Sequence, residues 1–102
     1  MKLYLISAKD KKTGTDKVLV LNPYAEENGR LNLDLDWTSV ESYEKNSNET
    51  DFLVVLSETE KAVLENIFFN KTSNSLKGIS AQDWRFALNP SNITDLAITA
   101  IN

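Results

Sequence analysis

The side chains best placed to do chemistry in this sequence are two aspartates in the stretch Leu31-Asn32-Leu33-Asp34-Leu35-Asp36-Trp37. Apolar and polar residues alternate there without exception, which predicts a β-strand with Asp34 and Asp36 on one wet face. Their oxygens would suit Mg²⁺ or Ca²⁺, and paired carboxylates can perform acid–base chemistry, as in glycosidases. However, same-face positions on a strand repeat only about every 6.6–6.8 Å, and an open strand face offers neither further ligands nor a cleft. The stretch therefore predicts a polar surface without a specific metal site or a catalytic pair.

Two other motifs resemble reactive sequences but lack an essential part. The run Lys12-Thr13-Gly14-Thr15-Asp16 nearly repeats the phosphorylation loop of P-type ATPases, but Lys11 stands where that loop needs its nucleophilic aspartate. A single glycine also cannot build the nest of backbone N–H groups that holds a phosphate. The run Ser42-Tyr43-Glu44-Lys45 has the Ser-x-x-Lys spacing of some acyl-enzymes but none of their companion motifs. We interpret the first motif as a hairpin turn and the second as coincidence.

Two residue types that enzymes often use are missing. The sequence contains no cysteine and no histidine. Disulfides and thiolate ligands are therefore excluded, as are the commonest general base and the commonest metal ligand. We expect a protein that is not an enzyme and has no cofactor.

Acidic residues are concentrated in the middle of the chain, whose 102 residues carry a net charge of −4. Between residues 26 and 65, eleven acids face three cations, a local charge of −8, whereas residues 1–17 carry +3. Such a stretch creates a field that repels nucleic acid and anionic membranes and attracts basic surfaces. We expect its first part to bind a partner through Glu26, Glu27, Asp34, Asp36, Glu41, Glu44, Glu49 and Asp51. The alternative is a solvated face that only keeps the protein soluble.

Aromatic residues supply candidate anchors beside these acids. Tyr24 and Tyr43 fall in polar stretches that flank the acidic residues, so we expect them to contact the partner. Trp37 ends the apolar face of the alternating strand and Trp84 falls on an apolar helical stripe, so we expect both tryptophans in the core.

The first half of the sequence predicts an antiparallel sheet. Residues 3–8 and 17–21 indicate the two strands of an N-terminal hairpin, joined by a polar turn. Pro23 should end the second strand, because proline cannot donate to a strand ladder. A loop then extends to residue 30, with a tight turn at Asn28-Gly29.

Two further strands complete a sheet of about four. In the strand near 31–37, the apolar side chains should share the face opposite the aspartates. In the strand near 51–56, the apolar run Phe52-Leu53-Val54-Val55-Leu56 is typical of a buried central strand.

The second half predicts helices. Ser57 and Glu60 have the spacing of a capping box for a helix over 58–69, whose buried stripe would be Val63, Leu64, Ile67 and Phe68. Ser80 should cap a second helix over 81–88, which buries Ala81, Trp84 and Leu88 and ends at Asn89-Pro90. Ser91 should cap a third helix, because the following apolar residues fit the i, i+3, i+4, i+7, i+8 spacing: Ile93, Leu96, Ala97, Ala100 and Ile101.

Strands first and helices last is the order of an α+β protein. We therefore predict a single acidic domain over residues 1–102, with an antiparallel sheet and two or three C-terminal helices packed on one face. No apolar run reaches the 18 residues of a membrane span, and the run after Met1 is too short for a signal-peptide core. We expect a cytoplasmic protein that binds neither membrane nor nucleic acid directly.

Two functions fit these features. The first is an acidic protein-binding module that occupies the basic groove of a nuclease or another nucleic-acid-binding protein by mimicking nucleic acid. Small phage-encoded inhibitors of restriction or CRISPR nucleases provide an analogy for this class, although no motif here identifies such a family. The second is a small structural or regulatory domain, for example a homodimer, without catalytic activity.

Overall fold

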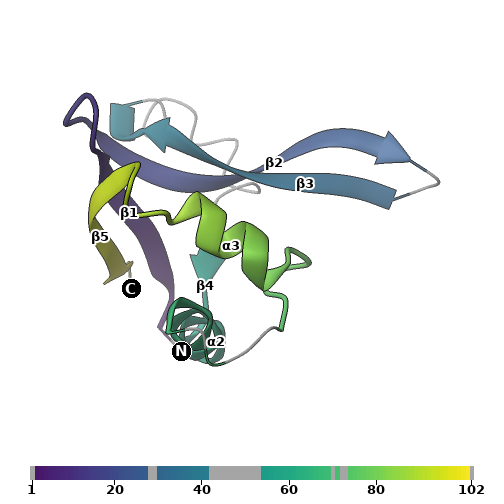
Figure 1. Cartoon of the computed structure of the whole chain (residues 1–102). Helices are drawn as coiled ribbons and strands as arrows, with labels where there is room; N and C mark the ends of the chain where they lie inside the picture. The colour runs from purple at the N-terminus through teal and green to yellow at the C-terminus, as the bar shows by residue number, and fades with distance from the viewer. Residues whose placement is uncertain (1, 28–29, 42–53, 70, 72–73, 102) are drawn as a thin grey trace.

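The computed structural model describes residues 2–27, 30–41, 54–69, 71 and 74–101, and the backbone alone for 22–27 and 30–34. It confirms the α+β class: strands form one antiparallel sheet and two helices lie against the same face of it (Figure 1). In chain order the elements are β1 (Tyr4–Asp10), β2 (Asp16–Glu27), β3 (Arg30–Ser39), β4 (Val55–Leu56), α2 (Glu58–Phe68), α3 (Ala81–Ala87) and β5 (Ile93–Ala100).

Strand β1 is the centre of the sheet. Strand β5 pairs with β1 along almost the whole length of β1, from Tyr4 to Asp10. The opposite edge is shared, because β2 pairs with Ser7–Lys9 and β4 pairs with Tyr4 and Leu5. The predicted strand near 51–56 is present in its described part: β4 (Val55–Leu56) pairs with β1, and Leu56 is fully buried, whereas residues 51–53 lie outside the described residues.

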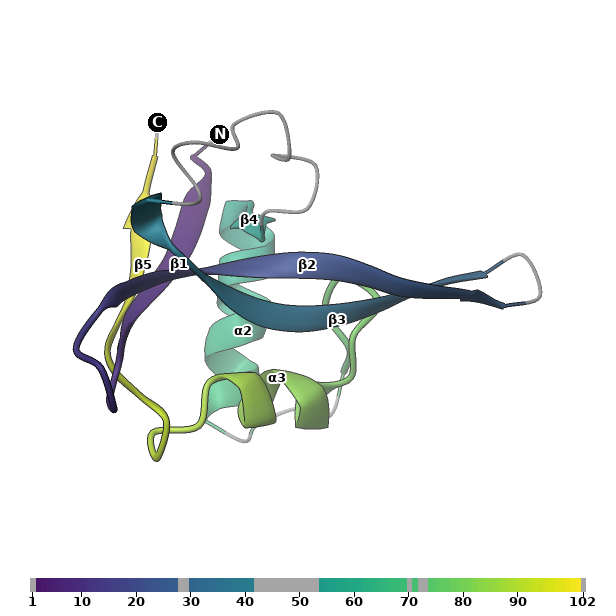
Figure 2. The same ribbon diagram turned by 90° about the horizontal axis from the view of Figure 1, so that it is seen from above.

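Strands β2 and β3 form a long hairpin that extends beyond the rest of the molecule (Figures 1 and 2). Their register runs from Lys17↔Ser39 to Glu27↔Arg30. The expectation that Pro23 ends the strand, with a loop from residue 24 to 30, was wrong. Beyond Val18 the ladder of β2 is with β3, and its other edge accepts one further hydrogen bond, from the Val54 N–H to the Leu19 carbonyl at 3.5 Å. Around Pro23 no described strand pairs with that edge, and the register with β3 shifts between Pro23 and Ala25, so a proline is tolerated there. The predicted Asn28-Gly29 turn lies outside the described residues.

The core lies between the sheet and the two helices. Its fully buried side chains come from β1, β2, β4, α2 and α3, and include Ile6, Leu19, Leu56, Leu64 and Trp84. Leu35 and Trp37 pack against this core while Asp36 between them is exposed, which confirms the predicted alternation for this part of β3. Both tryptophans are anchored by their indole N–H: Trp84 donates to the Leu76 carbonyl at 2.9 Å and Trp37 to the Ala87 carbonyl at 3.0 Å.

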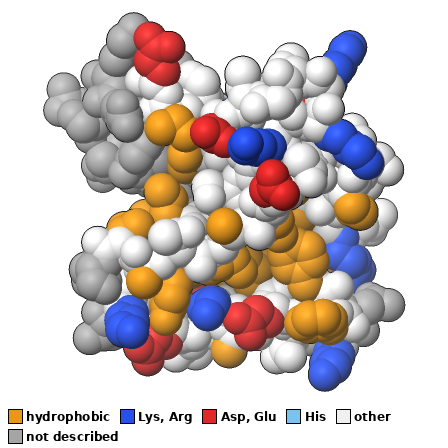
Figure 3. All heavy atoms as spheres, turned by 90° about the vertical axis from the view of Figure 1, so that its left-hand side faces the viewer, with side chains coloured by type: hydrophobic (Ala, Val, Ile, Leu, Met, Phe, Trp, Pro, Cys, Tyr) orange, Lys and Arg blue, Asp and Glu red, His pale blue; other side chains and the backbone are white. Residues whose placement is uncertain are grey.

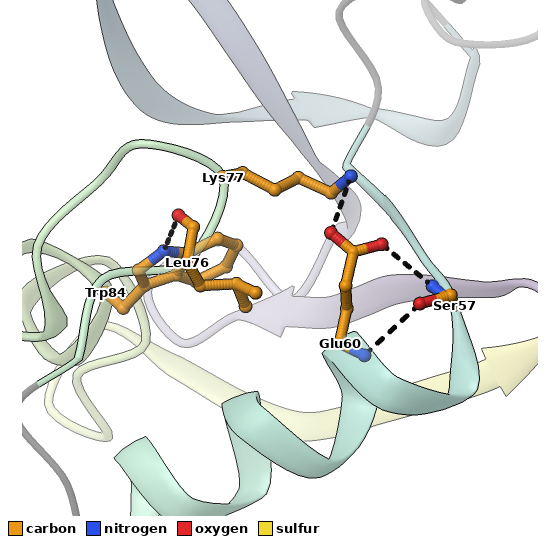
Figure 4. A network of polar contacts seen from close by, with 5 residues as sticks. All are labelled: Ser57, Glu60, Leu76, Lys77 and Trp84. Carbon is orange, nitrogen blue, oxygen red and sulfur yellow. Dashed lines mark hydrogen bonds and ion pairs between the residues drawn. The ribbon is translucent and has the colours of Figure 1, made fainter.

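Helix α2 begins at the predicted capping box (Figure 4). The Ser57 hydroxyl accepts from the Glu60 N–H at 3.2 Å, and the Glu60 carboxylate accepts from the Ser57 N–H at 3.1 Å. The other Glu60 oxygen lies 3.1 Å from the Lys77 ammonium. Lys77 and Gly78 both have positive φ, 54° and 78°, as a two-residue type I′ turn between Leu76 and Ile79 requires. One ion pair therefore ties this turn to the start of α2.

This pairing makes stability depend on the ionisation of Glu60. Burial raises the pKa of Glu60, but the Ser57 N–H and the Lys77 ammonium together hold it below its ordinary value of 4.5. A carboxylate with a lowered pKa stabilises the fold above that ordinary value, and the stabilisation is lost as the pH falls through the folded-state pKa.

Glu60→Gln is therefore expected to lower the free energy of unfolding by about 0.5–1.5 kcal/mol at neutral pH. The difference from wild type should shrink below pH 4.5, where the unfolded chain begins to take up the proton. Denaturant unfolding measured across this pH range tests it, with Glu58→Gln as the control that removes an exposed charge from the same helical turn. An offset that stayed constant with pH would contradict the assigned role of the ion pair.

The second helix is confirmed: Ser80 caps it, and Ala81, Trp84 and Leu88 are buried. The third predicted helix is wrong, because Ile93–Ala100 forms strand β5. The register with β1 shifts between Ser7 and Lys9, and Asp95 has a φ of 54°. This bulge turns Ile93 and Leu96 to the same side, although they are three residues apart. A bulged strand thus imitated the i, i+3 spacing of a helix.

Candidate protein-binding surfaces

The predicted partner-binding residues divide into three groups. Tyr24, Glu26, Glu27, Asp34 and Asp36 all lie on the β2–β3 hairpin. Glu41 follows directly after β3 and is exposed. Four of the predicted residues lie outside the part of the chain that the structure describes: Tyr43, Glu44, Glu49 and Asp51.

The hairpin distributes its acids along its length. The register pairs Glu27 with Arg30 at the distal end, and Asn22 with Asp34 and Val20 with Asp36 closer to the body. At about 3.3 Å per residue, the backbone positions from Glu26 back to Val20 span roughly 20 Å. Four acids and one cation, Arg30, lie within the segments 22–27 and 30–36. The hairpin is therefore an elongated acidic element, and we call it the acidic hairpin.

The lysines of the N-terminal segment lie at the opposite end of strand β2. Lys11 and Lys12 lie in the β1–β2 connection, and Lys9 and Lys17 lie at the adjoining ends of β1 and β2. Nine residues separate Lys17 from Glu26, which corresponds to about 30 Å of strand. The distal acids are therefore well beyond a Debye length from these lysines at physiological salt.

The motif that resembles an ATPase loop is a turn in this connection. The Asp10 carboxylate accepts from the N–H groups of Lys12 and Thr13, at 2.8 and 3.1 Å. These two hydrogen bonds hold the pKa of Asp10 below its ordinary value. Gly14 has a φ of 73°, which suits glycine in a tight turn. The motif is accounted for by local turn geometry.

The acids of helix α2 do not join the acidic hairpin. Glu58, Glu60 and Glu65 lie on helix α2, below the sheet in Figure 1. Two of these have cationic partners, since Lys77 pairs with Glu60 and Lys61 lies 3.5 Å from Glu65. The described acids of this run are thus divided mainly between the hairpin and helix α2, and cationic side chains pair with two of the three acids on the helix.

A second surface was missed by the sequence interpretation. An open groove of about 540 Å³ lies between α2 and β5, lined by Phe68, Phe69, Leu96 and Ile98 and flanked by Lys61 and Glu65. It continues into a hollow of about 440 Å³, which shares Phe68 and Leu96 with it and adds Lys11, Leu88, Pro90, Ile93, Thr94 and Asp95. Figure 3 shows apolar side chains gathered in a hollow on this side of the molecule. We call the two parts together the β5 groove.

Phe68 contradicts the predicted stripe of the first helix. Its side chain is 37 % exposed and that of Phe69 is 72 % exposed, whereas Leu64 and Ile67 are buried. Two consecutive phenylalanines at the end of a helix cannot both face the core, because successive helical side chains point about 100° apart. That pair was the available sequence signal for this surface.

Within the described ranges, no group of three or more acidic side chains is arranged to hold a metal ion. Across the same residues, no helix is long and apolar enough to span a membrane. No protein-family model, curated protein or solved structure shows significant similarity to the chain.

Proposed function

We propose that this protein is a binding module that inserts its acidic hairpin into a basic groove on another protein. The proposed partner is a nuclease or another nucleic-acid-binding protein, and the action is inhibition by occupancy in the cytoplasm, without catalysis. One observation carries the proposal: four acids and one cation lie on a two-stranded arm that extends beyond the body of the molecule (Figure 2).

The spacing along the hairpin supports mimicry of nucleic acid. Positions i and i+2 of a strand, such as Asp34 and Asp36, repeat about every 6.6–6.8 Å. Successive phosphates of one strand of B-form DNA advance about 3.4 Å along the axis but lie roughly 7 Å apart, because the backbone winds around that axis, so carboxylates at this spacing can replace neighbouring phosphates. A groove that binds phosphates with Lys and Arg would accept such a row.

Shape supports the same proposal. The distal part of the hairpin, from residue 22 to 34, has β2–β3 pairing as its described ladder and extends beyond the body, so it can enter a groove while Leu19, Leu35 and Trp37 stay packed in the core. The exposed Asp36 is also held in place locally, since its carboxylate accepts from the Trp37 N–H at 2.8 Å. Preorganised charges of this kind lose little conformational entropy on binding.

The double variant Asp34→Asn/Asp36→Asn is expected to weaken partner binding about tenfold or more at low salt. Asparagine keeps an oxygen that can accept from the Trp37 N–H, so the hairpin should remain folded. The partner is first captured from host extract on immobilised protein at low salt, then purified, and its affinity for each variant is measured by titration calorimetry. Duplex DNA or RNA should compete with the wild-type protein for it.

The matched control is Glu58→Gln/Asp83→Asn, which removes two exposed charges from the starts of α2 and α3. This variant has the same net charge as the hairpin variant but should bind almost as wild type does. If both double variants weakened partner binding equally, the effect would come from the overall charge of the protein and not from the hairpin. No weakening by either would leave the acids as a solubilising face and refute the proposal.

A further inference from the structure

Strand β5 is an edge strand with no evident protection against pairing. Among the described strands it pairs with β1 alone. Natural edge strands are commonly guarded by lysine, proline or a central charge, whereas the run from Leu96 to Ala100 contains none of these. The bulge at Asp95 interrupts only the beginning of the strand.

The hydrogen-bonding pattern identifies which backbone groups of β5 point away from β1. The Ile101 N–H donates to the Leu3 carbonyl at 2.9 Å, which marks a hydrogen-bonded pair at this end of the β1–β5 ladder. Because such pairs alternate in antiparallel sheets, Thr99 and Ala97 also direct their backbone groups toward β1. Ile98 and Ala100 therefore direct theirs outward, where another strand can pair with them.

The β5 groove provides an apolar surface beside this edge. The exposed parts of Phe68 and Phe69, 37 % and 72 %, together equal about one whole phenylalanine, or roughly 150–250 Å². A standard interface buries about 800 Å² from each partner. The two rings can thus form about a quarter of such an interface, with strand backbone and charged side chains around them.

Each end of the groove carries one cation and one anion, and in a two-fold dimer the charges at one end would face those at the other end of the second copy. Lys61 lies over the Tyr4 ring, and Tyr4 pairs with Ala100, so Lys61 and Glu65 flank the C-terminal end of β5. Lys11 and Asp95 line the hollow at its N-terminal end. An antiparallel pair of β5 strands brings the N-terminal end of one copy beside the C-terminal end of the other. Lys11 and Asp95 of each copy would then lie beside Glu65 and Lys61 of the other copy.

This charge balance favours a second copy over a strongly charged partner. The described side chains that line the groove include two cations and two anions, and Lys71 adds a cation 5.9 Å from the centroid of the Phe69 ring, so this face is not acidic although the chain carries −4. We propose that the protein forms a two-fold dimer in which β5 pairs with β5 of a second copy and Phe69 is buried at the interface. The dimer uses no residue of the acidic hairpin, so it stands or falls independently of the proposed function.

Sedimentation velocity between about 1 µM and 1 mM protein is expected to show a reversible monomer–dimer equilibrium. Phe69→Ala should raise the dissociation constant about tenfold or more, as expected for an aromatic interface anchor. Phe86→Ala is the matched control, because Phe86 is 76 % exposed on α3 and lines neither part of the groove. It should leave the dissociation constant within about twofold of wild type.

Amide exchange of the wild-type protein tests the strand pairing itself. The Ile98 and Ala100 amides should exchange slowly at protein concentrations that favour the dimer and fast at concentrations that favour the monomer. The Ala97 and Thr99 amides, already bonded to β1, should be protected at both concentrations.

Three results would overturn the dimer: a monomer at 1 mM, equal effects of Phe69→Ala and Phe86→Ala, or unprotected Ile98 and Ala100 amides in a dimer. A monomer whose β5 edge instead captured an extended peptide of another protein would also overturn it.

Discussion

Trp84→Ala is expected to lower the free energy of unfolding by about 3–5 kcal/mol, which is a large share of the 5–15 kcal/mol typical of a domain. The Trp84 side chain is 0 % exposed and is the largest fully buried side chain that the structure describes. Alanine would leave a cavity between α2, α3 and the sheet and would also remove one of the two donors to the Leu76 carbonyl. Guanidinium unfolding followed by circular dichroism would measure the loss.

Two phenylalanine variants separate packing from hydrogen bonding. Trp84→Phe keeps most of the apolar volume and removes one of two donors to the Leu76 carbonyl, which still accepts from the Ile79 N–H at 3.0 Å, so about 0.5–1.5 kcal/mol should be lost. Trp37→Phe removes the comparable bond to the Ala87 carbonyl at a half-buried position, where water can substitute, and should cost less. A Trp84→Ala protein as stable as wild type would show that Trp84 does not support the core.

Affinity for the basic partner is expected to fall about a hundredfold when the salt concentration rises from about 0.1 to 1 M. The Debye length shortens from about 10 to about 3 Å over this range, which screens the attraction between separated charges. Charges that steer association can raise the on-rate by a factor of a hundred or more, and this contribution disappears at high salt. Calorimetric titrations, with on-rates from stopped flow, would follow the change.

The variant Asp34→Asn/Asp36→Asn gives this salt dependence an internal control. Its affinity should depend less steeply on salt and should approach that of wild type at the highest salt concentration. An affinity that was flat across the salt range for the wild-type protein would exclude electrostatic docking, whatever the partner proved to be.

The two proposals also combine into one geometric expectation. A β5–β5 dimer would carry two acidic hairpins, one from each copy, on arms that belong to the same continuous sheet. Such a dimer could bind two copies of a partner, or two grooves of one, with the gain in avidity that linkage provides. The stoichiometry of the complex would distinguish these cases from binding by a monomer.

Local sequence signals predicted much of the fold. The Ser57–Glu60 capping box is present as expected, because both of its hydrogen bonds join residues three apart in the chain. The alternation of Leu35, Asp36 and Trp37 predicted a two-faced strand, because side chains on a strand alternate whatever surrounds them. Strands before helices predicted the α+β class for a similar reason, since a half-apolar sheet needs a cover.

The errors lie where neighbours that are distant in sequence override a local preference. Pro23 stays in a strand because, among the described strands, none pairs with the second edge of β2 around this residue. Residues 93–100 form a strand because β1 offers them a ladder, and a bulge gave their apolar residues a helical spacing. Neither the unpaired edge of β2 nor the bulge in β5 can be recognised from the residue types of these segments alone.

The candidate surfaces divide in the same way. The sequence by itself determined that this protein has an acidic middle segment and no histidine or cysteine chemistry, because charge and residue type are properties of the chain. The short-range spacing of its residues also predicted a core built on apolar strands and capped helices. Tertiary structure alone decided that four of the acids share one extended hairpin, and that Phe69 and Ile98 line one groove beside an open strand edge. Those arrangements depend on which segments pair and pack against each other. The local conformational preferences of these segments would be satisfied equally well if the segments were not in contact, so the sequence does not reveal the pairing.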